Sequence, residues 1–169
     1  MRKHLDRINA IGIAPKPWTD FTRPGIYQDP VELATLCAWM EHLAIQSYLE
    51  IGTAAGGNML LFEMMGVKGW GVDILAPSMG NAHRVCIGRS TDSHAIEWAQ
   101  EHGPYDMVFI DCVHTYKAVK ADFENYAPLA EKLVVFHDLC HEGVRKYWGE
   151  LPGDKLEFYR TIGIGVMFQ

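Results

Sequence analysis

Acidic and histidine residues follow two apolar segments of this chain, at positions where they could support acid–base or metal chemistry. Asp111 closes one apolar run, and His114 follows three residues later. His137 and Asp138 close a second apolar run. Because parallel strands present their carboxyl ends at one edge of an α/β sheet, we expect these side chains to meet there. Such a cluster can act as a general base or hold a divalent cation.

A glycine-rich turn followed by a distant acidic residue forms a second pattern. Residues 48–57 read Tyr-Leu-Glu-Ile-Gly-Thr-Ala-Ala-Gly-Gly, and Asp73 lies 21 positions after Gly52, within Gly-Trp-Gly-Val-Asp-Ile. In a doubly wound sheet this order builds a nucleoside site, because glycine lets the backbone approach the ligand and the later carboxylate binds ribose hydroxyls. The glycines are spaced G-x-x-x-G-G rather than G-x-G-x-x-G, which disfavours a close pyrophosphate cradle. Glu50, just before the turn, could accept a hydrogen bond from a ligand ammonium group.

A zinc site is the alternative reading of the cysteines and histidines near the two strand ends. These residues are Cys112, His114, His137, Cys140 and His141. A closed structural zinc site shows paired ligands at short fixed spacing, which this set only approaches. Asp111 and Cys112 are neighbours on an extended segment, so their side chains should point apart. We therefore expect no structural zinc, and expect any cation held by Asp111 and Asp138 to be magnesium, calcium or manganese.

Composition limits the class of protein. A chain of 169 residues, 49% of them hydrophobic, is expected to form one domain over residues 1–169. Its net charge of −6 offers no general attraction for nucleic acid or anionic membrane. The chain contains no apolar stretch near the roughly 20 residues that span a bilayer. Its first residues are not expected to form a signal peptide, because Asp6, Arg7 and Asn9 interrupt the apolar core that one needs. Its four cysteines show no C-x-x-C pair and are expected to be reduced, so we predict a cytoplasmic protein.

The elements that must position these residues follow an alternating pattern. Strands are predicted at 47–51, 69–73, 84–88, 106–110 and 133–137. Helices are predicted near 58–65, 93–102 and 115–127, and Pro128 should end the last of them. Near-continuous apolar strands alternating with helices predict a buried parallel sheet.

The two ends of the chain differ from this pattern. Residues 1–28 contain several proline and glycine residues and are expected to form an irregular arm, which covers either a pocket or a sheet edge. A helix should begin after Asp29, with Pro30 at its first position and Glu32 completing a capping box. Beyond a short helix near 142–150, the apolar runs 155–161 and 164–168 predict an antiparallel hairpin at the edge of the sheet.

Several of these segments together resemble a known family. Leu-Glu-Ile-Gly-Thr-Ala-Ala-Gly-Gly, Gly-Val-Asp-Ile, Phe-Ile-Asp-x-x-His-Thr-Tyr-x-x-Val-x-x-Asp-Phe and Val-Phe-His-Asp are similar to motifs of class I S-adenosylmethionine-dependent methyltransferases. The run from Asp111 to Asp122 most resembles the small-molecule branch called the methyltransferase-24 group. The similarity covers roughly residues 30–169. It implies a doubly wound, Rossmann-like, seven-stranded sheet that is mostly parallel, with an antiparallel C-terminal hairpin.

The resemblance also implies roles for individual residues. The turn would hold the methionine part of S-adenosylmethionine through Glu50, Gly52, Thr53, Ala54 and Gly56. Asp73 would bind the ribose, and the adenine would lie near Ile74 and Ser90. Arg89 replaces the acid that such proteins often carry before that serine, so recognition of the adenine amine there differs. Asp111 would lie at the rim shared by cofactor and acceptor, and related O-methyltransferases hold a divalent cation at positions matching Asp111 and Asp138.

The expected function is methyl transfer from S-adenosylmethionine to a small molecule, most simply to an oxygen. His114 or His137 would be the base beside Asp111, or a cation such as magnesium would acidify the acceptor hydroxyl. A non-catalytic S-adenosylmethionine-binding module and a nicotinamide-dependent oxidoreductase are the alternatives. The sequence carries no motif for the methyl acceptor or for an oligomeric state.

Overall fold

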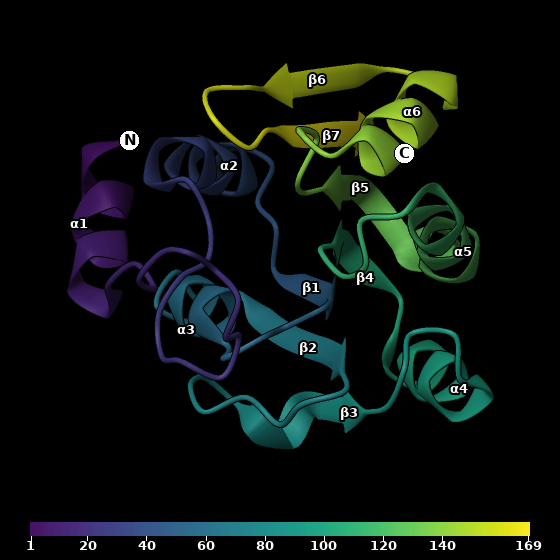
Figure 1. Cartoon of the computed structure of the whole chain (residues 1–169), viewed down its shortest axis with the longest axis horizontal. Helices are drawn as coiled ribbons and strands as arrows, with labels where there is room; N and C mark the ends of the chain where they lie inside the picture. The colour runs from purple at the N-terminus through teal and green to yellow at the C-terminus, as the bar shows by residue number, and fades with distance from the viewer.

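Seven strands form one sheet in the order β3-β2-β1-β4-β5-β7-β6 in the computed structural model, which describes residues 1–169 (Figure 1). Strands β1 to β5 are parallel, and β7 runs antiparallel to both β5 and β6. This arrangement confirms the predicted fold class. The strands are β1 (Ser47–Ile51), β2 (Lys68–Asp73), β3 (Val85–Ile87), β4 (Tyr105–Ile110), β5 (Ala130–Phe136), β6 (Lys155–Phe158) and β7 (Ile164–Phe168).

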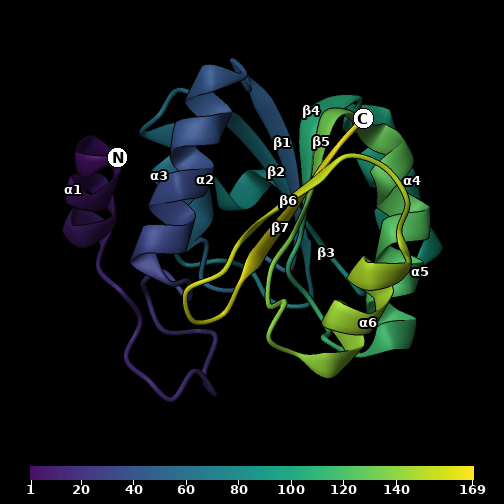
Figure 2. The ribbon, with the colours of Figure 1, turned by 90° about the horizontal axis from the view of Figure 1, so that it is seen from above.

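Helices cover both faces of the sheet, which explains the near-continuous apolar strands. Helices α1 to α3 lie on one face and α4 to α6 on the other (Figure 2). Each layer has its own apolar core, of 20 buried residues on the first face and 17 on the second, so neither face is left to solvent. None of the helices combines the length and the apolar character needed to cross a membrane. The helices are α1 (Arg2–Ile11), α2 (Pro30–His42), α3 (Gly57–Glu63), α4 (Ser93–His102), α5 (Tyr116–Tyr126) and α6 (Glu142–Glu150).

The N-terminal segment corrects one expectation. Residues 2–11 form helix α1 rather than part of an irregular arm, so only residues 12–28 lack a helix. Ile8 is fully buried in the core of the first face, and Leu5 and Ile11 pack against it. These three apolar residues recur every third position, a helical spacing that the proline and glycine residues farther along the arm obscured.

Helix α2 begins as predicted, but Glu32 has a different role from the one expected. The Asp29 carboxylate accepts hydrogen bonds from the backbone N–H groups of Val31 and Glu32 at 2.9 and 3.1 Å. Instead of completing a capping box, the buried Glu32 carboxylate accepts from the backbone of the β6–β7 loop. Its donors include the N–H groups of Thr161 at 2.6 Å and Gly163 at 2.9 Å. Glu32 therefore anchors the loop of the C-terminal hairpin to α2.

The same loop supports the segment that follows β5. The backbone N–H of Leu139 donates to the Gly163 carbonyl at 3.2 Å, and the N–H of Cys140 donates to the Ile162 carbonyl at 2.8 Å. These bonds fix the backbone directly after Asp138. The position of that aspartate thus depends on the hairpin as well as on its own strand.

Candidate functional site

Backbone crowding explains why the turn after β1 contains glycine. Gly52 has φ +93° and Gly56 has φ +88°, a region that favours glycine. A Cβ on Gly52 would collide with the backbone carbonyl of Asp111, and one on Gly56 would collide with the carbonyl of Met79. The two glycines therefore let the turn lie against the loops that follow β4 and β2.

Asp73 and the turn, which the sequence paired by spacing, are in direct contact. The Asp73 carboxylate accepts hydrogen bonds from the backbone N–H of Ala54 and of Leu75, both at 2.8 Å, and lies 3.5 Å from the Thr53 hydroxyl. A carboxylate has about four lone-pair sites, so these bonds leave acceptor capacity for a ligand. Asp73 holds the turn in place, and ribose binding by Asp73 stays a prediction.

Exposed apolar side chains mark the same edge of the sheet. Ile74, just beyond β2, is 66% exposed, and Ile87 at the end of β3 and Val113 after β4 are also exposed. A flat aromatic base could cover such surface. In the β3–α4 loop, the Ser90 carbonyl accepts a hydrogen bond from the Tyr126 hydroxyl at 2.7 Å, which fixes that loop against α5. The predicted adenine residues Ile74 and Ser90 thus lie at the expected edge, while their contact with adenine stays a prediction.

The N-terminal arm packs across a pocket beside the turn. The pocket is lined by Glu50, Gly52, Thr53, Ala54 and Asp111 among the predicted residues, and by arm residues that include Gly25 and Gln28. The Gln28 side-chain amide donates to Asp111 Oδ2 at 2.6 Å. The cavity that remains is about 20 Å³, roughly the space of one water molecule. Of the two positions considered for the arm, the structure therefore shows the one over a pocket.

Glu50 lies at the bottom of this pocket and is fully buried. Its carboxylate accepts hydrogen bonds from Asn58 Nδ2 at 2.8 Å and from the Tyr48 hydroxyl at 3.2 Å. Burial, which disfavours the charged form, raises the pKa of Glu50 to about 8. Glu50 is thus a buried acid that a cationic ligand would ionise.

Two amide oxygens in the pocket point to the kind of ligand it accepts. Gln28 Oε1 and Asn58 Oδ1 are buried acceptors without a donor. Together with Glu50 they suit a group that carries several N–H donors and a positive charge, such as the ammonium of an amino acid. The chemistry of the pocket therefore fits the methionine end of S-adenosylmethionine, although its volume requires the arm to move. Sequence reasoning missed both residues; Asn58, a polar residue in a short apolar helix, offered a signal, whereas Gln28 offered none.

A second group of functional side chains lies where β4 and β5 end. This strand-end cluster consists of Asp111, His114, His137 and Asp138. His137 Nδ1 lies 2.9 Å from Asp111 Oδ1 and 3.1 Å from Asp138 Oδ2, so the imidazole joins the two carboxylates. Burial opposes a charge on His137, but the negative Asp111 and Asp138 outweigh it and raise its pKa to about 10. Burial likewise opposes ionisation of Asp138, yet the imidazoles of His114 and His137 beside it hold its pKa well below the usual range.

His114 reaches the same carboxylate from the β4–α5 loop. His114 Nε2 lies 2.7 Å from Asp138 Oδ2 and 4.0 Å from Asp111 Oδ1. Burial opposes its charge, but the two aspartates raise the pKa of His114 to about 9. The His114 side chain is 31% exposed and that of His137 only 2%, so a ligand can reach His114 and not His137. The four residues predicted to meet at this edge do meet.

The donors at this edge fit magnesium poorly. Magnesium prefers an octahedron of oxygen ligands and keeps several waters. Here the nitrogen of His137 lies between the carboxylates of Asp111 and Asp138, and His114 approaches the same carboxylate of Asp138. Oxygen ligation by the two aspartates alone stays a prediction.

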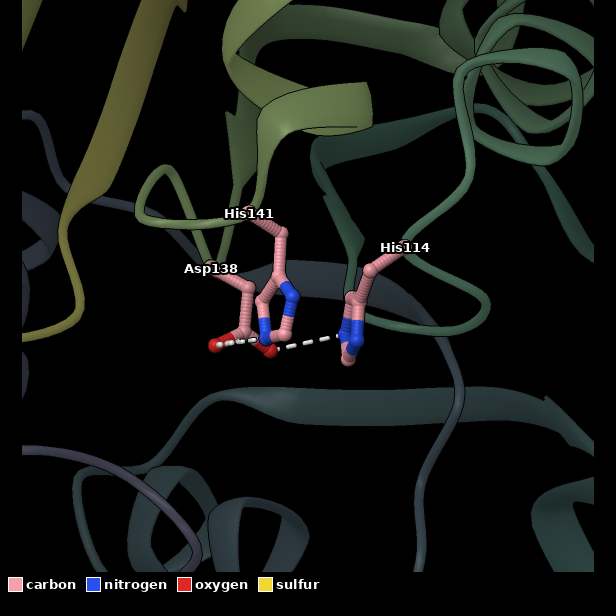
Figure 3. Close-up of side chains that lie close together, drawn as sticks. All are labelled: His114, Asp138 and His141. Carbon is pink, nitrogen blue, oxygen red and sulfur yellow. Dashed lines mark ion pairs between the residues drawn. The ribbon is translucent and has the colours of Figure 1, made fainter.

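One further histidine at this edge was considered in sequence reasoning only as a zinc ligand with cysteine. His141 Nε2 lies 3.9 Å from Asp138 Oδ1, and the His141 ring stacks on that of His114 with centroids 4.6 Å apart (Figure 3). The sequence did offer a signal for this position. His141 lies three residues after Asp138 and directly before α6, and a helix that starts so soon after a strand keeps the intervening residues close to the strand end.

Comparison with known sequences gives a match to a family model and a match to one relative. A family model described as a methyltransferase domain, of the methyltransferase-24 type, matches residues 68–139. The uncharacterized protein y4gI of Sinorhizobium fredii is 29% identical over an alignment 163 residues long, gaps included, and the match covers 77% of this chain and 18% of that protein. The chain therefore spans less than a fifth of the length of that relative.

Solved structures share the fold at low sequence identity. A putative caffeoyl-CoA O-methyltransferase from Staphylococcus aureus is 18% identical, with a TM-score of 0.64, and the match covers 99% of this chain and 90% of that one. MycE methyltransferase from the mycinamycin biosynthetic pathway, in complex with Mg, SAH and mycinamycin VI, is 17% identical with a TM-score of 0.63. That match covers 85% of this chain and 50% of MycE.

The solved structures show that the chain shares the fold of these methyltransferases. The domain match over residues 68–139 agrees with the resemblance to S-adenosylmethionine-dependent methyltransferases of the methyltransferase-24 type.

Proposed function

We propose that this protein transfers the methyl group of S-adenosylmethionine to an oxygen of a small molecule. The observation that carries the proposal is the position of Asp111. Its side chain contacts both Gln28 in the pocket beside the turn and His137 in the strand-end cluster. A donor held in the pocket and an acceptor held at the cluster would therefore lie side by side, as a methyl transfer requires.

The pocket residues would bind and orient the donor. When bound, S-adenosylmethionine supplies an electrophilic methyl group on a sulfonium. Glu50, Gln28 and Asn58 offer acceptors for its ammonium, and Asp73 offers acceptors for the ribose. The carboxylates of Glu50 and Asp111 favour a cation over a neutral molecule, and the arm excludes water once it lies over the turn.

His114 would remove the proton of the acceptor. The negative charge of Asp138, 2.7 Å from His114 Nε2, stabilises the imidazolium that forms. His137 is too buried to meet an acceptor and instead holds Asp111 and Asp138 together. In this proposal His137 positions the two aspartates, and His114 alone acts as the base, although the sequence suggested either histidine for that role. Because the pKa of His114 is raised to about 9, base catalysis should become faster as the pH rises toward that value.

A binding module without catalysis is the second candidate. The arm leaves a cavity of only about 20 Å³ beside the turn. A protein that buried its ligand under the arm and never opened toward an acceptor would show the same arrangement. The domain match gives no support to a nicotinamide-dependent oxidoreductase.

The cellular setting is part of the proposal. We propose a small molecule rather than nucleic acid as the acceptor, because the net charge of −6 repels a phosphate backbone. We propose that the protein acts in the cytoplasm, where its four free cysteines would stay reduced. Residues 1–169 would act as one domain, since the same sheet carries the pocket beside the turn and the strand-end cluster.

A turnover assay distinguishes the two candidates. S-adenosylhomocysteine is measured after incubation with S-adenosylmethionine and panels of phenols, sugars and peptidic metabolites, with and without a chelator. Turnover that needs His114 and survives chelation supports the proposal. Tight binding of S-adenosylhomocysteine without turnover of any acceptor supports the binding module. Turnover abolished by the chelator and restored by magnesium would contradict the metal-free mechanism.

A further inference from the structure

Three side chains converge at the open side of the strand-end cluster. His114 comes from the loop after β4, and Asp138 and His141 come from the loop between β5 and α6 (Figure 3). One ligand atom from each of these residues lies within 4.8 Å of the others. The two rings are nearly parallel, with 17° between their planes, and both approach the carboxylate of Asp138.

The separations between these atoms suit a metal ion with nitrogen and oxygen ligands. Ligand atoms about 2.1 Å from a tetrahedral ion lie about 3.4 Å from one another. His114 Nε2 and His141 Nε2 lie 2.7 and 3.9 Å from oxygens of Asp138, distances on either side of that value. Small rotations of the histidine side chains would bring both nitrogen–oxygen distances to about 3.4 Å.

The hydrogen bonding of His114 is incomplete without a further ligand. His114 Nε2 is buried and has no hydrogen bond of acceptable direction, although a carboxylate oxygen lies 2.7 Å away. Its in-plane electron pair or proton therefore points away from that oxygen. The His141 side chain is 53% exposed, so an ion can enter from solvent and keep an open coordination position.

Two of the three ligands belong to a fixed loop. Asp138 has φ +59°, a left-handed conformation that is uncommon for residues other than glycine. The N–H of His141 donates to the Asp138 carbonyl at 2.9 Å, and the N–H of Cys140 donates to Ile162 at 2.8 Å. The loop thus presents the two side chains on one side before any ion arrives.

We propose that His114, Asp138 and His141 bind a divalent transition-metal ion of the zinc, cobalt or nickel class. Two imidazoles and one carboxylate select such ions over magnesium and calcium, which prefer oxygen. The site differs from an oxygen-ligated cation at Asp111 and Asp138, since two of its three ligands are nitrogen. It also differs from a closed cysteine-rich zinc site, because no cysteine is needed and one position stays open.

Metal binding and base catalysis exclude each other at His114, a consequence that rests on the proposed function. A neutral imidazole has one nitrogen with a free electron pair. When that pair binds a metal ion, the other nitrogen carries the hydrogen and can accept no proton. Occupation of the site would therefore inhibit methyl transfer.

Cobalt titration tests the site without any measure of activity. Chelator-treated protein is titrated with Co²⁺ and followed by its visible absorption bands, which report coordination by nitrogen. His141→Ala removes one ligand, and His83→Ala, an exposed histidine in the 3₁₀ turn Ala82–Arg84, is the matched control. We expect one ion per chain in the wild type and in His83→Ala, and at least tenfold weaker binding in His141→Ala.

A thermal measurement confirms that the variants are folded. All three proteins should unfold cooperatively without metal, and Zn²⁺ should raise the Tm of the wild type and of His83→Ala more than that of His141→Ala. Equal Co²⁺ affinity in wild type and His141→Ala would overturn the proposal, as would binding of Mg²⁺ with no binding of Co²⁺. These readouts need no methyl acceptor. If the protein binds Co²⁺ but turns over no substrate, the metal-site proposal stands and only the proposed methyl transfer is contradicted.

Discussion

The buried Glu50 makes a quantitative prediction about stability. Its pKa is about 8 in the folded protein against an ordinary value of 4.5, because its carboxylate is fully buried. The protonated form therefore stabilises the fold. This stabilisation is fully present below about pH 4.5 and is lost as the pH rises to about 8. One pKa unit corresponds to about 1.4 kcal/mol, so the loss is about 5 kcal/mol in total and about 3 kcal/mol at pH 7.

Glu50→Gln removes the ionisable group and keeps the shape of the side chain. The free energy of unfolding of the variant, minus that of the wild type, should increase by up to about 5 kcal/mol from pH 4.5 to pH 8 and then level off. Urea unfolding of both proteins at fixed ionic strength, from pH 4.5 to pH 9, measures this difference. Glu97→Gln, at an exposed glutamate of α4, is the matched control and should show no such trend.

The same group links proton release to ligand binding. A cationic ammonium beside Glu50 favours its charged form, so binding of S-adenosylhomocysteine at pH 7 should release close to one proton. Calorimetry in buffers of different ionisation enthalpy measures this number, which should fall to zero in Glu50→Gln. A stability difference that does not vary with pH, together with no proton release in the wild type, would refute the assignment of Glu50 as a buried neutral acid.

Three other substitutions probe the remaining parts of the site. Asp73→Ala should weaken S-adenosylhomocysteine binding by about 1.5–3 kcal/mol, and equal affinity in calorimetry would remove Asp73 from the ribose site. Gly52→Val should abolish that binding and lower the Tm, because a Cβ there collides with the backbone of Asp111; unchanged binding would show that the turn serves only the fold. His114→Ala should remove the rise of kcat that the wild type shows as the pH approaches 9, and an unaltered pH profile would exclude His114 as the base.

Much of the fold could be predicted because its signals are local. The apolar run at β1 and the spacing of α4 and α6 gave bounds that match the structure, since burial on both faces leaves a clear pattern in the sequence. The predicted ends of the other strands differ from those in the structure by up to three residues. β5 begins at Ala130, which pairs with Tyr105, rather than at 133, because the polar Glu131 and Lys132 interrupt the apolar run before the buried part of the strand.

The site was predictable where the topology alone brings residues together. Asp111 and Asp138 end adjacent parallel strands, so their meeting follows from the order of the elements. The contact of Gln28 with Asp111, by contrast, joins residues 83 positions apart through an arm without regular structure, which no periodicity reports. The open side of the cluster was also missed as a nitrogen-rich site, because the sequence does not show that the ring of His141 stacks on that of His114.

The anchoring of the hairpin loop by Glu32 has a consequence for the order in which the site can form during folding. Its bonds to the N–H groups of Thr161 and Gly163 join residues 129 and 131 positions apart. Contacts of such long range form slowly and late. Because the same loop holds the backbone that follows Asp138, the strand-end cluster should acquire its final geometry only when the hairpin docks on α2. A chain still emerging from the ribosome could thus fold the turn that carries Gly52 well before it could carry out proton transfer.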